Sequence, residues 1–291
     1  METTLLLAGI RFYFHSECEL NIDPELKNFI TSTNERADVS VRISREWDRF
    51  ALPDTPQMGE DMICRYFQQD DRLYCVTRGN SRDPVACAVY GTDCREILCI
   101  LNEKPFRRPP DNLGSILRMI PMRAIFQRFG VQFLHASRIS HKGKGVLFSG
   151  PSGVGKTTQA RLWHTYRGAE ILCNDRTLLR RVDGIWHTYG YPLDGSEPVR
   201  SSAVVPLGCI VLLAQGSENH VERLKSSRGT ALLMKQSVID IWNPEARKAA
   251  VDIILSLMES IPVYLLTCTP DVQAVEFLEE TLKKEGVILF E

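Results

Sequence analysis

The sequence lacks a Cys-x-x-Cys pair, a long apolar run and a large net charge of either sign. Its nine cysteines form an odd set, which excludes a stapled disulfide framework and a zinc site of paired cysteines, so we expect reduced, mostly buried thiols. No segment approaches the about eighteen apolar residues of a membrane helix, and the N-terminus carries no basic leader. We therefore expect a cytoplasmic protein without a membrane partner.

The charge balance argues against nucleic acid as a partner. Lysine and arginine number 35 and aspartate and glutamate 36, for a net charge of −1, so the chain has no overall positive field to hold a polyanion. Apolar residues make up 44% of the 291 residues and charged residues 24%, which is typical of a globular protein with a sizeable core. A chain of this length accommodates two domains. We place the boundary at the proline-rich residues 106–112, giving domains 1–105 and 106–291.

The first hundred residues are typical of strands. Short segments rich in β-branched, aromatic and cysteine residues are broken by turn formers, and we expect strands near residues 5–14, 39–44, 63–68, 73–77, 86–90 and 96–101. Residues 69–72 predict a hairpin turn, and Gly79-Asn80 another. The pattern predicts a mainly antiparallel β domain, and no motif in it indicates a chemistry.

The remainder alternates between strand and helix patterns. Residues 113–129 show helical spacing interrupted at Pro121, and Gly130 ends the run. We expect strands at residues 131–137, 145–149, 170–173, 209–214 and 263–267, a hairpin at 177–189, and helices from 156, near 229–237, at 244–260 and at 271–284. Such alternation indicates an α/β layer architecture.

Residues 150–157 carry a motif for phosphate. Gly150-x4-Gly155-Lys156-Thr157 follows an apolar strand and precedes a helical stretch, which is the context of a Walker A loop. Glycines let successive backbone N–H groups point inward, and the helix N-terminus adds partial positive charge. Lys156 is predicted to contact the β- and γ-phosphates of a nucleoside triphosphate, and the Thr157 hydroxyl to bind Mg2+. The predicted nucleotide-binding set is Gly150, Ser152, Gly153, Val154, Gly155, Lys156, Thr157 and Thr158.

A site for a nucleoside triphosphate also needs a carboxylate at the end of a neighbouring strand. Asp175 follows the short apolar strand at 170–173 and is the candidate. It would hold the metal or its water, or accept a proton from an attacking hydroxyl. The turn-rich residues 189–200 add Glu197, a candidate second Mg2+ ligand, and Arg200, a candidate phosphoryl clamp. A solvated turn is the alternative for both.

Leu134-His135, the sequence GPSGVGKTT, Cys173-Asn174-Asp175 and the Gly-Ser-Glu-Pro loop together resemble the catalytic domain of HPr kinase/phosphorylase. That domain is related to the nucleotide-binding core of phosphoenolpyruvate carboxykinase, and the resemblance covers about residues 130–270. It implies an α/β P-loop kinase core in which Thr157 and Glu197 hold magnesium. It further implies that Asp175 is the proton acceptor and that His135 lies beside the transferring phosphate, so that Asp175, Lys156 and His135 form the catalytic set.

The sequence departs from the pattern of this family in several places, including two that bear on its activity. The family's paired aspartates appear here as Asn174-Asp175, which leaves a reverse, phosphate-removing activity open, and no segment matches the family's HPr-binding segment. The C-terminal half looks like smaller HPr-kinase-like proteins of bacteria, some associated with peptide-modification systems. The sequence therefore predicts an ATP- and Mg2+-dependent kinase that acts on a serine or threonine hydroxyl of a peptide or protein. A small hydroxylated metabolite as acceptor, a nucleotide-gated binding module with ATPase activity, and a homo-oligomeric state all stay open.

Overall fold

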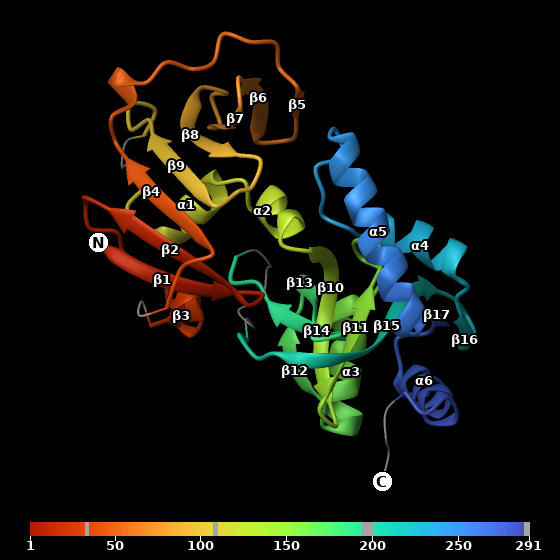
Figure 1. Cartoon of the computed structure of the whole chain (residues 1–291). Helices are drawn as coiled ribbons and strands as arrows, with labels where there is room; N and C mark the ends of the chain where they lie inside the picture. Colours follow the sequence, from red (N-terminus) through yellow and green to blue (C-terminus); the bar gives the residue numbers. More distant parts are fainter. Residues whose placement is uncertain (33–34, 107–109, 194–200, 288–291) are drawn as a thin grey trace. The chain divides into compact units, whose positions relative to one another are not determined.

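The computed structural model describes residues 1–32, 35–106, 110–193 and 201–287, and it is a mixed α/β structure with two multi-stranded sheets (Figure 1). The chain divides into two compact units. Unit 1 contains Met1–Phe129 and Asp240–Arg247, and unit 2 contains Gly130–Ile239 and Lys248–Glu291. The domain limits expected from the sequence, 1–105 and 106–291, stay a prediction. None of the described helices is both long and apolar enough to span a lipid bilayer.

Unit 1 is built on a nine-stranded sheet. In spatial order its strands are β3 (Ile30–Thr31), β1 (Glu2–Leu7), β2 (Ile10–Ser16), β4 (Val39–Ser44), β9 (Glu96–Leu101), β8 (Pro84–Gly91), β7 (Arg72–Arg78), β6 (Cys64–Gln69) and β5 (Gly59–Glu60). The pairs on either side are antiparallel, but β4 pairs in parallel with both β2 and β9. The sheet is thus mainly antiparallel, as expected, and only its centre is parallel. The residues between β2 and β4 form a connection long enough to return the chain in the same direction.

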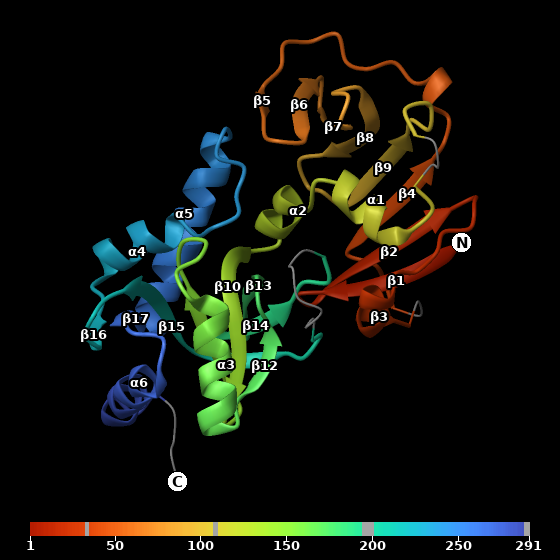
Figure 2. The ribbon, with the colours of Figure 1, turned by 180° about the vertical axis from the view of Figure 1, so that it is seen from behind.

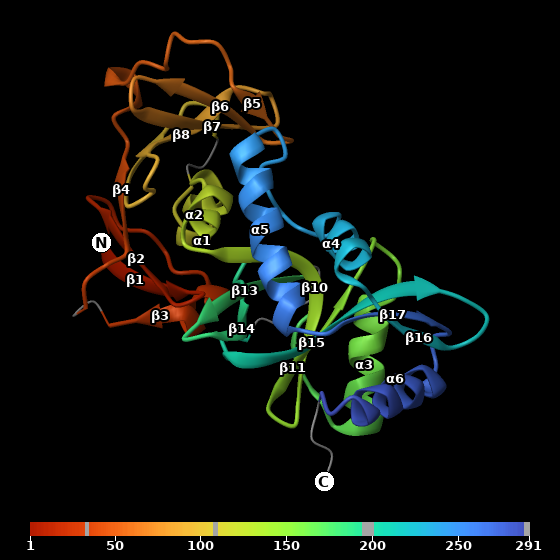
Figure 3. The same cartoon turned by 45° about the vertical axis from the view of Figure 1, so that its right-hand side comes forward.

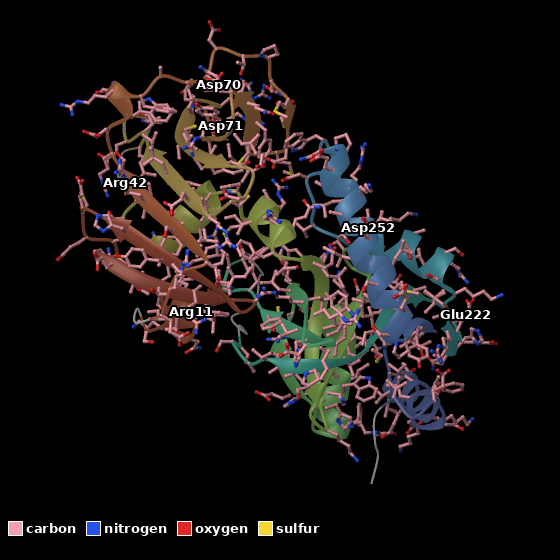
Figure 4. The ribbon with its side chains drawn as sticks, viewed as in Figure 1. Arg11, Arg42, Asp70, Asp71, Glu222 and Asp252 are labelled. Carbon is pink, nitrogen blue, oxygen red and sulfur yellow. The ribbon has the colours of Figure 1, made fainter. Side chains whose placement is uncertain are left out.

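The N-terminal segment also differs from the structure expected from the sequence. The sequence predicts one strand over residues 5–14, yet β1 and β2 form a hairpin that turns at Ala8 and Gly9, whose φ angles are +52° and +71°. Positive φ at two successive residues matches the right-handed strand twist, which favours such a turn. The other expected strands of this unit are confirmed within two residues at each end, as is the hairpin between β6 and β7. Figure 4 labels Asp70 and Asp71 at the tip of that hairpin.

Two short helices follow the sheet of unit 1. Helix α1 (Leu113–Met119) begins after Asn112, whose side chain accepts a hydrogen bond from the Ser115 N–H, and α2 (Met122–Arg128) restarts after Pro121. The interruption predicted at Pro121 is therefore confirmed. Helix α1 packs against β7 and β8 (Figure 2). Gly130, with a φ of +68°, ends the second helix as expected.

The excursion Asp240–Arg247 completes unit 1. The Trp242 ring stacks on Tyr66 with centroids 4.6 Å apart, and it covers Gly59 so closely that any Cβ there would overlap it. Asp240 is buried and forms an ion pair of 3.0 Å with Arg123. Burial raises the pKa of Asp240, and the neighbouring guanidinium opposes that rise. Aromatic stacking and a buried ion pair therefore hold residues 240–247 in unit 1.

Unit 2 is built on an eight-stranded sheet. Its main path runs β11 (Lys144–Ser149), β10 (Val131–His141), β13 (Arg176–Val182), β14 (Ile185–Gly190), β15 (Val205–Gln215), β17 (Val263–Cys268) and β16 (His220–Arg223), and β12 (Glu170–Cys173) also pairs with β10. The sequence does not predict strand β16, because its four polar or half-buried residues show no strand pattern. Strands β11, β15 and β17 are parallel, and β15 also pairs with β11.

Helices cover both faces of this sheet. Helix α3 (Lys156–Arg167) and α6 (Val272–Lys284) pack over one core that contains Phe148, Trp163 and Tyr264. Helix α4 (Ser226–Met234) and α5 (Pro244–Ser260) cover a second core that contains Leu147, Leu233 and Leu257. Figure 3 shows α3 and α6 side by side. The expected helix at 244–260 is confirmed at both ends, and this two-sided covering explains why the sheet's central strands are apolar on both faces.

The cysteines behave as the sequence predicts. All nine are free thiols, and seven are buried, with Cys18 exposed and Cys268 half-buried. Burial raises the pKa of the Cys99 thiol to about 12. These side chains serve as small apolar groups in the core.

Candidate functional site

The residues between β11 and α3 form a glycine loop, residues 150–155. Strand β11 is fully buried from Gly145 to Ser149, and α3 begins at Lys156, so the expected strand, loop and helix follow one another. Gly150, Gly153 and Gly155 have φ angles of +148°, +78° and +112°. A side chain rarely adopts these angles, and a Cβ on Gly150 would lie 3.0 Å from Val154 and 3.3 Å from the Leu213 carbonyl. The loop conformation therefore requires its glycines.

Lys156 is the first residue of α3 and turns back over the loop. Its Nζ donates hydrogen bonds to the carbonyls of Gly150 at 2.9 Å and Pro151 at 3.0 Å. The side chain is buried, and burial lowers the pKa of its ammonium group, while the negative charge of Asp175 opposes that shift. A cation that is held at a helix N-terminus beside a glycine loop is suited to an anionic ligand.

The parallel strands bring further polar groups to the same edge of the sheet. Because β11, β15 and β17 run in one direction, their carboxyl ends meet at one edge. Gln215 at the end of β15 donates from Nε2 to the Gly153 carbonyl at 3.3 Å, and Gln159 of α3 contacts the Cys268 sulfur at the end of β17 at 3.3 Å. The loop is therefore braced by its neighbouring strand.

His135 reaches this edge through strand register. Strand β10 is antiparallel to β11 with Ala136 opposite Ser149, so His135 lies beside the start of the loop. The Ser149 hydroxyl donates to the His135 carbonyl at 2.7 Å, and the His135 backbone N–H donates to the Gln236 carbonyl at 2.9 Å. These bonds fix the backbone from which the imidazole projects.

Asp175 lies between β12 and β13, which both pair with β10. Its carbonyl accepts from the Ala136 N–H at 2.9 Å, and the preceding carbonyl, of Asn174, accepts from the Ser137 hydroxyl at 3.0 Å. The Asp175 carboxylate accepts a hydrogen bond from Nε2 of His135 at 2.8 Å. A carboxylate only accepts, so this bond requires the proton on Nε2.

Electrostatics favour an ionised Asp175. The hydrogen bond from His135 holds the pKa of this carboxyl below its ordinary value against the opposing effect of burial, and the positive charges of Arg176 and Lys156 add to the lowering. The Arg176 guanidinium is 3.7 Å from the carboxylate. The site thus combines a carboxylate, an imidazole and a lysine ammonium next to a loop of backbone amides.

The structure brings together three residues predicted from the sequence, Lys156, Asp175 and His135, at residues 150–155. Of the other loop residues, Ser152 and Thr158 are exposed, while Val154 and Thr157 are half-buried at the start of the helix. Glu197 and Arg200 lie outside the described residues, so their roles as metal ligand and phosphoryl clamp stay predictions. In the described ranges, no group of three or more histidine, cysteine, aspartate or glutamate side chains is arranged to hold a metal.

Several supporting residues carry no motif of their own in the sequence. Ser149, Arg176 and Gln215 contact the predicted residues, but only their positions at strand ends next to the motifs could have singled them out. Arg138 is likewise not predicted. It is completely buried in β10, donates to the carbonyls of Ser201 at 2.9 Å and Ala203 at 2.8 Å, and burial lowers its pKa to about 10.

Comparisons with known proteins give two findings. A family model described as SynChlorMet cassette protein ScmC matches residues 112–283, which is more than half of the chain. Among solved structures, the chain is similar to the Hpr(Ser) kinase/phosphatase from Coxiella burnetii, at 13% sequence identity and a TM-score of 0.33, over 53% of this chain and 99% of that chain. No curated protein matches the sequence significantly.

Proposed function

The chain belongs to the SynChlorMet cassette protein ScmC family, and from the site within the matched region we propose that it is an ATP- and Mg2+-dependent phosphotransferase. It transfers the γ-phosphoryl group to a hydroxyl, for which we propose a serine or threonine of a peptide or protein. The observation that carries this proposal is the meeting of Lys156 and the His135–Asp175 pair at the glycine loop.

The residues of the loop fit a triphosphate. Glycines at positive φ leave positions 150, 153 and 155 without side chains, so backbone N–H groups of residues 152–158 can turn toward phosphate oxygens. Lys156 would exchange its bonds to the two loop carbonyls for bonds to phosphate. Mg2+, held by Thr157 and by the predicted ligand Glu197, would neutralise charge on the β- and γ-phosphates.

Asp175 acts as the proton acceptor in this proposal. The acceptor oxygen forms a bond to the γ-phosphorus while the bond from that phosphorus to the bridging oxygen breaks, and its electron pair leaves with ADP. The hydroxyl proton passes to a carboxylate oxygen of Asp175. His135 orients that carboxylate through the 2.8 Å hydrogen bond, and Lys156 balances the charge that develops on the phosphoryl oxygens.

A radiolabel assay tests the proposal. The full chain is incubated with γ-labelled ATP, Mg2+ and fractionated bacterial extract, and a Lys156→Ala protein and EDTA serve as controls. Label on an acceptor that depends on intact Lys156 and on the metal supports the kinase. Release of free phosphate alone would support the second candidate, a nucleotide-gated binding module, which unit 1 favours because it is large and lies mostly outside the family match.

A binding measurement tests whether the site takes a nucleotide. If a folded sample shows neither calorimetric heat nor a thermal shift with Mg·ATP or Mg·ADP, the site does not take a nucleotide and both candidates are wrong. If nucleotide binds but no labelled acceptor is found, a direct screen of small hydroxylated compounds distinguishes a metabolite kinase from a peptide kinase.

A further inference from the structure

Unit 1 contains a cavity that the proposed phosphotransfer does not use. Its volume is about 500 Å3, which is within the range of pockets that bury small ligands. It lies between the end of β7 with the turn that follows it, the start of β8, and α1. Figure 2 shows α1 beside these strands.

The walls of the cavity are mostly apolar. Ile63, Val85, Phe106 and Met119 supply aliphatic and aromatic surface. Ile63 is 49% exposed although it is a large apolar residue, and Val85 is buried. An apolar side chain of a ligand would find matching surface here, because burying apolar area is favourable wherever shape allows contact.

The charges in the wall are of one sign. Among the lining residues, all within the described part of the chain, the only ionisable side chains are Arg78 and Arg118. Arg78 is held in place, since it donates to the Asp61 carbonyl at 2.8 Å and lies 3.5 Å from the carboxylate of Glu60, which is about half exposed. The Arg78 side chain is only 14% exposed. Arg118 is on the exposed side of α1, where it donates to the Gly114 carbonyl at 3.2 Å.

We propose that this cavity is a binding site for an apolar carboxylate, that is, a carboxyl group attached to an aromatic or branched aliphatic side chain. The planar guanidinium of arginine matches a carboxylate with two parallel hydrogen bonds, and the apolar walls take the attached group. Such chemistry occurs both in small organic acids and at the C-terminus of a peptide that ends in an apolar residue.

The test uses the full chain without nucleotide, so its outcome is independent of the proposed phosphotransfer. Phenylbutyrate, phenylbutanol and phenylbutylamine share an apolar body and differ in charge. Each is titrated by calorimetry and by NMR of protein labelled on methionine and isoleucine methyl groups. We expect phenylbutyrate to bind at least about tenfold more tightly than the alcohol, because its carboxylate forms a hydrogen bond between charged groups. We also expect it to shift the methyl signals of Ile63 and Met119.

Two matched variants test whether the positive charge in the cavity wall binds the carboxylate. Arg118→Gln removes one of the two cations from the wall, and we expect the affinity for phenylbutyrate to fall toward that for phenylbutanol while the affinity for phenylbutanol is unaffected. Arg72→Gln removes the same charge from the other end of β7, where the side chain is 53% exposed, and should change nothing. Ser115→Phe places a ring in the cavity and should abolish the binding of all three probes in a protein that still unfolds cooperatively.

Several outcomes would overturn the assignment: equal binding of acid and alcohol, preference for the amine, equal effects of Arg118→Gln and Arg72→Gln, or methyl shifts that leave Ile63 and Met119 unmoved. A peptide ending in phenylalanine, compared as free acid and as amide, identifies the source. Tighter binding of the free-acid peptide than of phenylbutyrate indicates a peptide C-terminus, and exclusion of the peptide indicates a small organic acid; either result supports the site.

Discussion

Nε2 of His135 lies 2.8 Å from Oδ1 of Asp175, although the two residues are 40 positions apart in the sequence. The imidazole orients the carboxylate and lowers its pKa, and Lys156 is close enough for its charge to act on the same group. A carboxylate of lowered pKa remains ionised well into acidic solution, so it is ready to accept a proton or to hold a cation.

Replacing Asp175 by asparagine should abolish phosphoryl transfer while leaving nucleotide binding intact. The amide keeps the shape of the side chain but accepts no proton, and loss of a general base costs about 10²- to 10⁴-fold in rate. The rate is measured as transfer of label from γ-labelled ATP, and Mg·ATP affinity by calorimetry. Asp183→Asn, in the exposed turn between β13 and β14, is the matched control and should behave as wild type. Normal transfer by Asp175→Asn would show that the base is another group.

Asp175 should stabilise the folded protein at neutral pH and lose this effect in acid. Its folded-state pKa lies below its ordinary value, so the ionised carboxylate contributes stability above the unfolded-state pKa of about 3.9. That contribution is lost as pH falls through the lowered folded-state pKa. Urea unfolding of wild type and Asp175→Asn should therefore differ most near neutral pH, and the difference should disappear as pH falls below the unfolded-state pKa and through the lowered folded-state pKa. A difference that grows on acidification would contradict the assigned shift.

Removing His135 should move the acidic limb of the activity profile. The hydrogen bond from His135 is the largest cause of the lowered pKa of Asp175, so His135→Phe should raise that pKa toward its ordinary value. The acidic limb of kcat/KM against pH should then lie at higher pH than in wild type. His187→Phe, on β14, changes the same residue type and should leave the limb in place. If His135→Phe also leaves the limb unmoved, the pair does not set the ionisation that governs activity.

Lys156→Ala should lose transfer and weaken nucleotide binding. The variant removes the cation that balances charge on the transferring group, and deletion of one such donor costs about 10²- to 10³-fold in rate. Label transfer and calorimetry with Mg·ATP measure the two effects. Lys144→Ala changes an exposed lysine at the opposite end of β11 and is the control. Equal activity of the two alanine variants would remove Lys156 from the site.

Gly150→Ala should damage both the loop and nucleotide binding. Its φ of +148° is one that side chains rarely adopt, and a Cβ would crowd Val154 and the Leu213 carbonyl; strain of this kind costs about 1–3 kcal/mol. Thermal unfolding with and without Mg·ATP is the measurement, because a ligand that binds only the folded state raises the Tm.

Gly143→Ala supplies the comparison for that variant. Gly143 also has a positive φ, of +72°, but no atom lies within 4 Å of the position that a Cβ would take there, and it belongs to the turn between β10 and β11. It should lose about 1–2 kcal/mol and keep the full nucleotide-induced rise in Tm. A full nucleotide response in Gly150→Ala as well would argue against a phosphate site at the loop.

The sequence by itself determined most of the local elements. Strands β4 and β9 and helix α5 begin and end at the expected residues, because short runs of apolar and β-branched residues favour strands and the helical spacing of apolar residues favours a helix. The break at Pro121 followed from the missing N–H and fixed φ of proline, and the glycine loop from the requirement for positive φ between a strand and a helix.

Tertiary structure alone decided the pairings. The parallel contacts of β4 and the return of Asp240–Arg247 to unit 1 depend on which distant segments meet, and periodicity carries no such information. The same is true of the site. Asp175 meets His135 only because β12 and β13 both pair with β10 in one register, and a shift by one residue would turn His135 to the other face of the sheet.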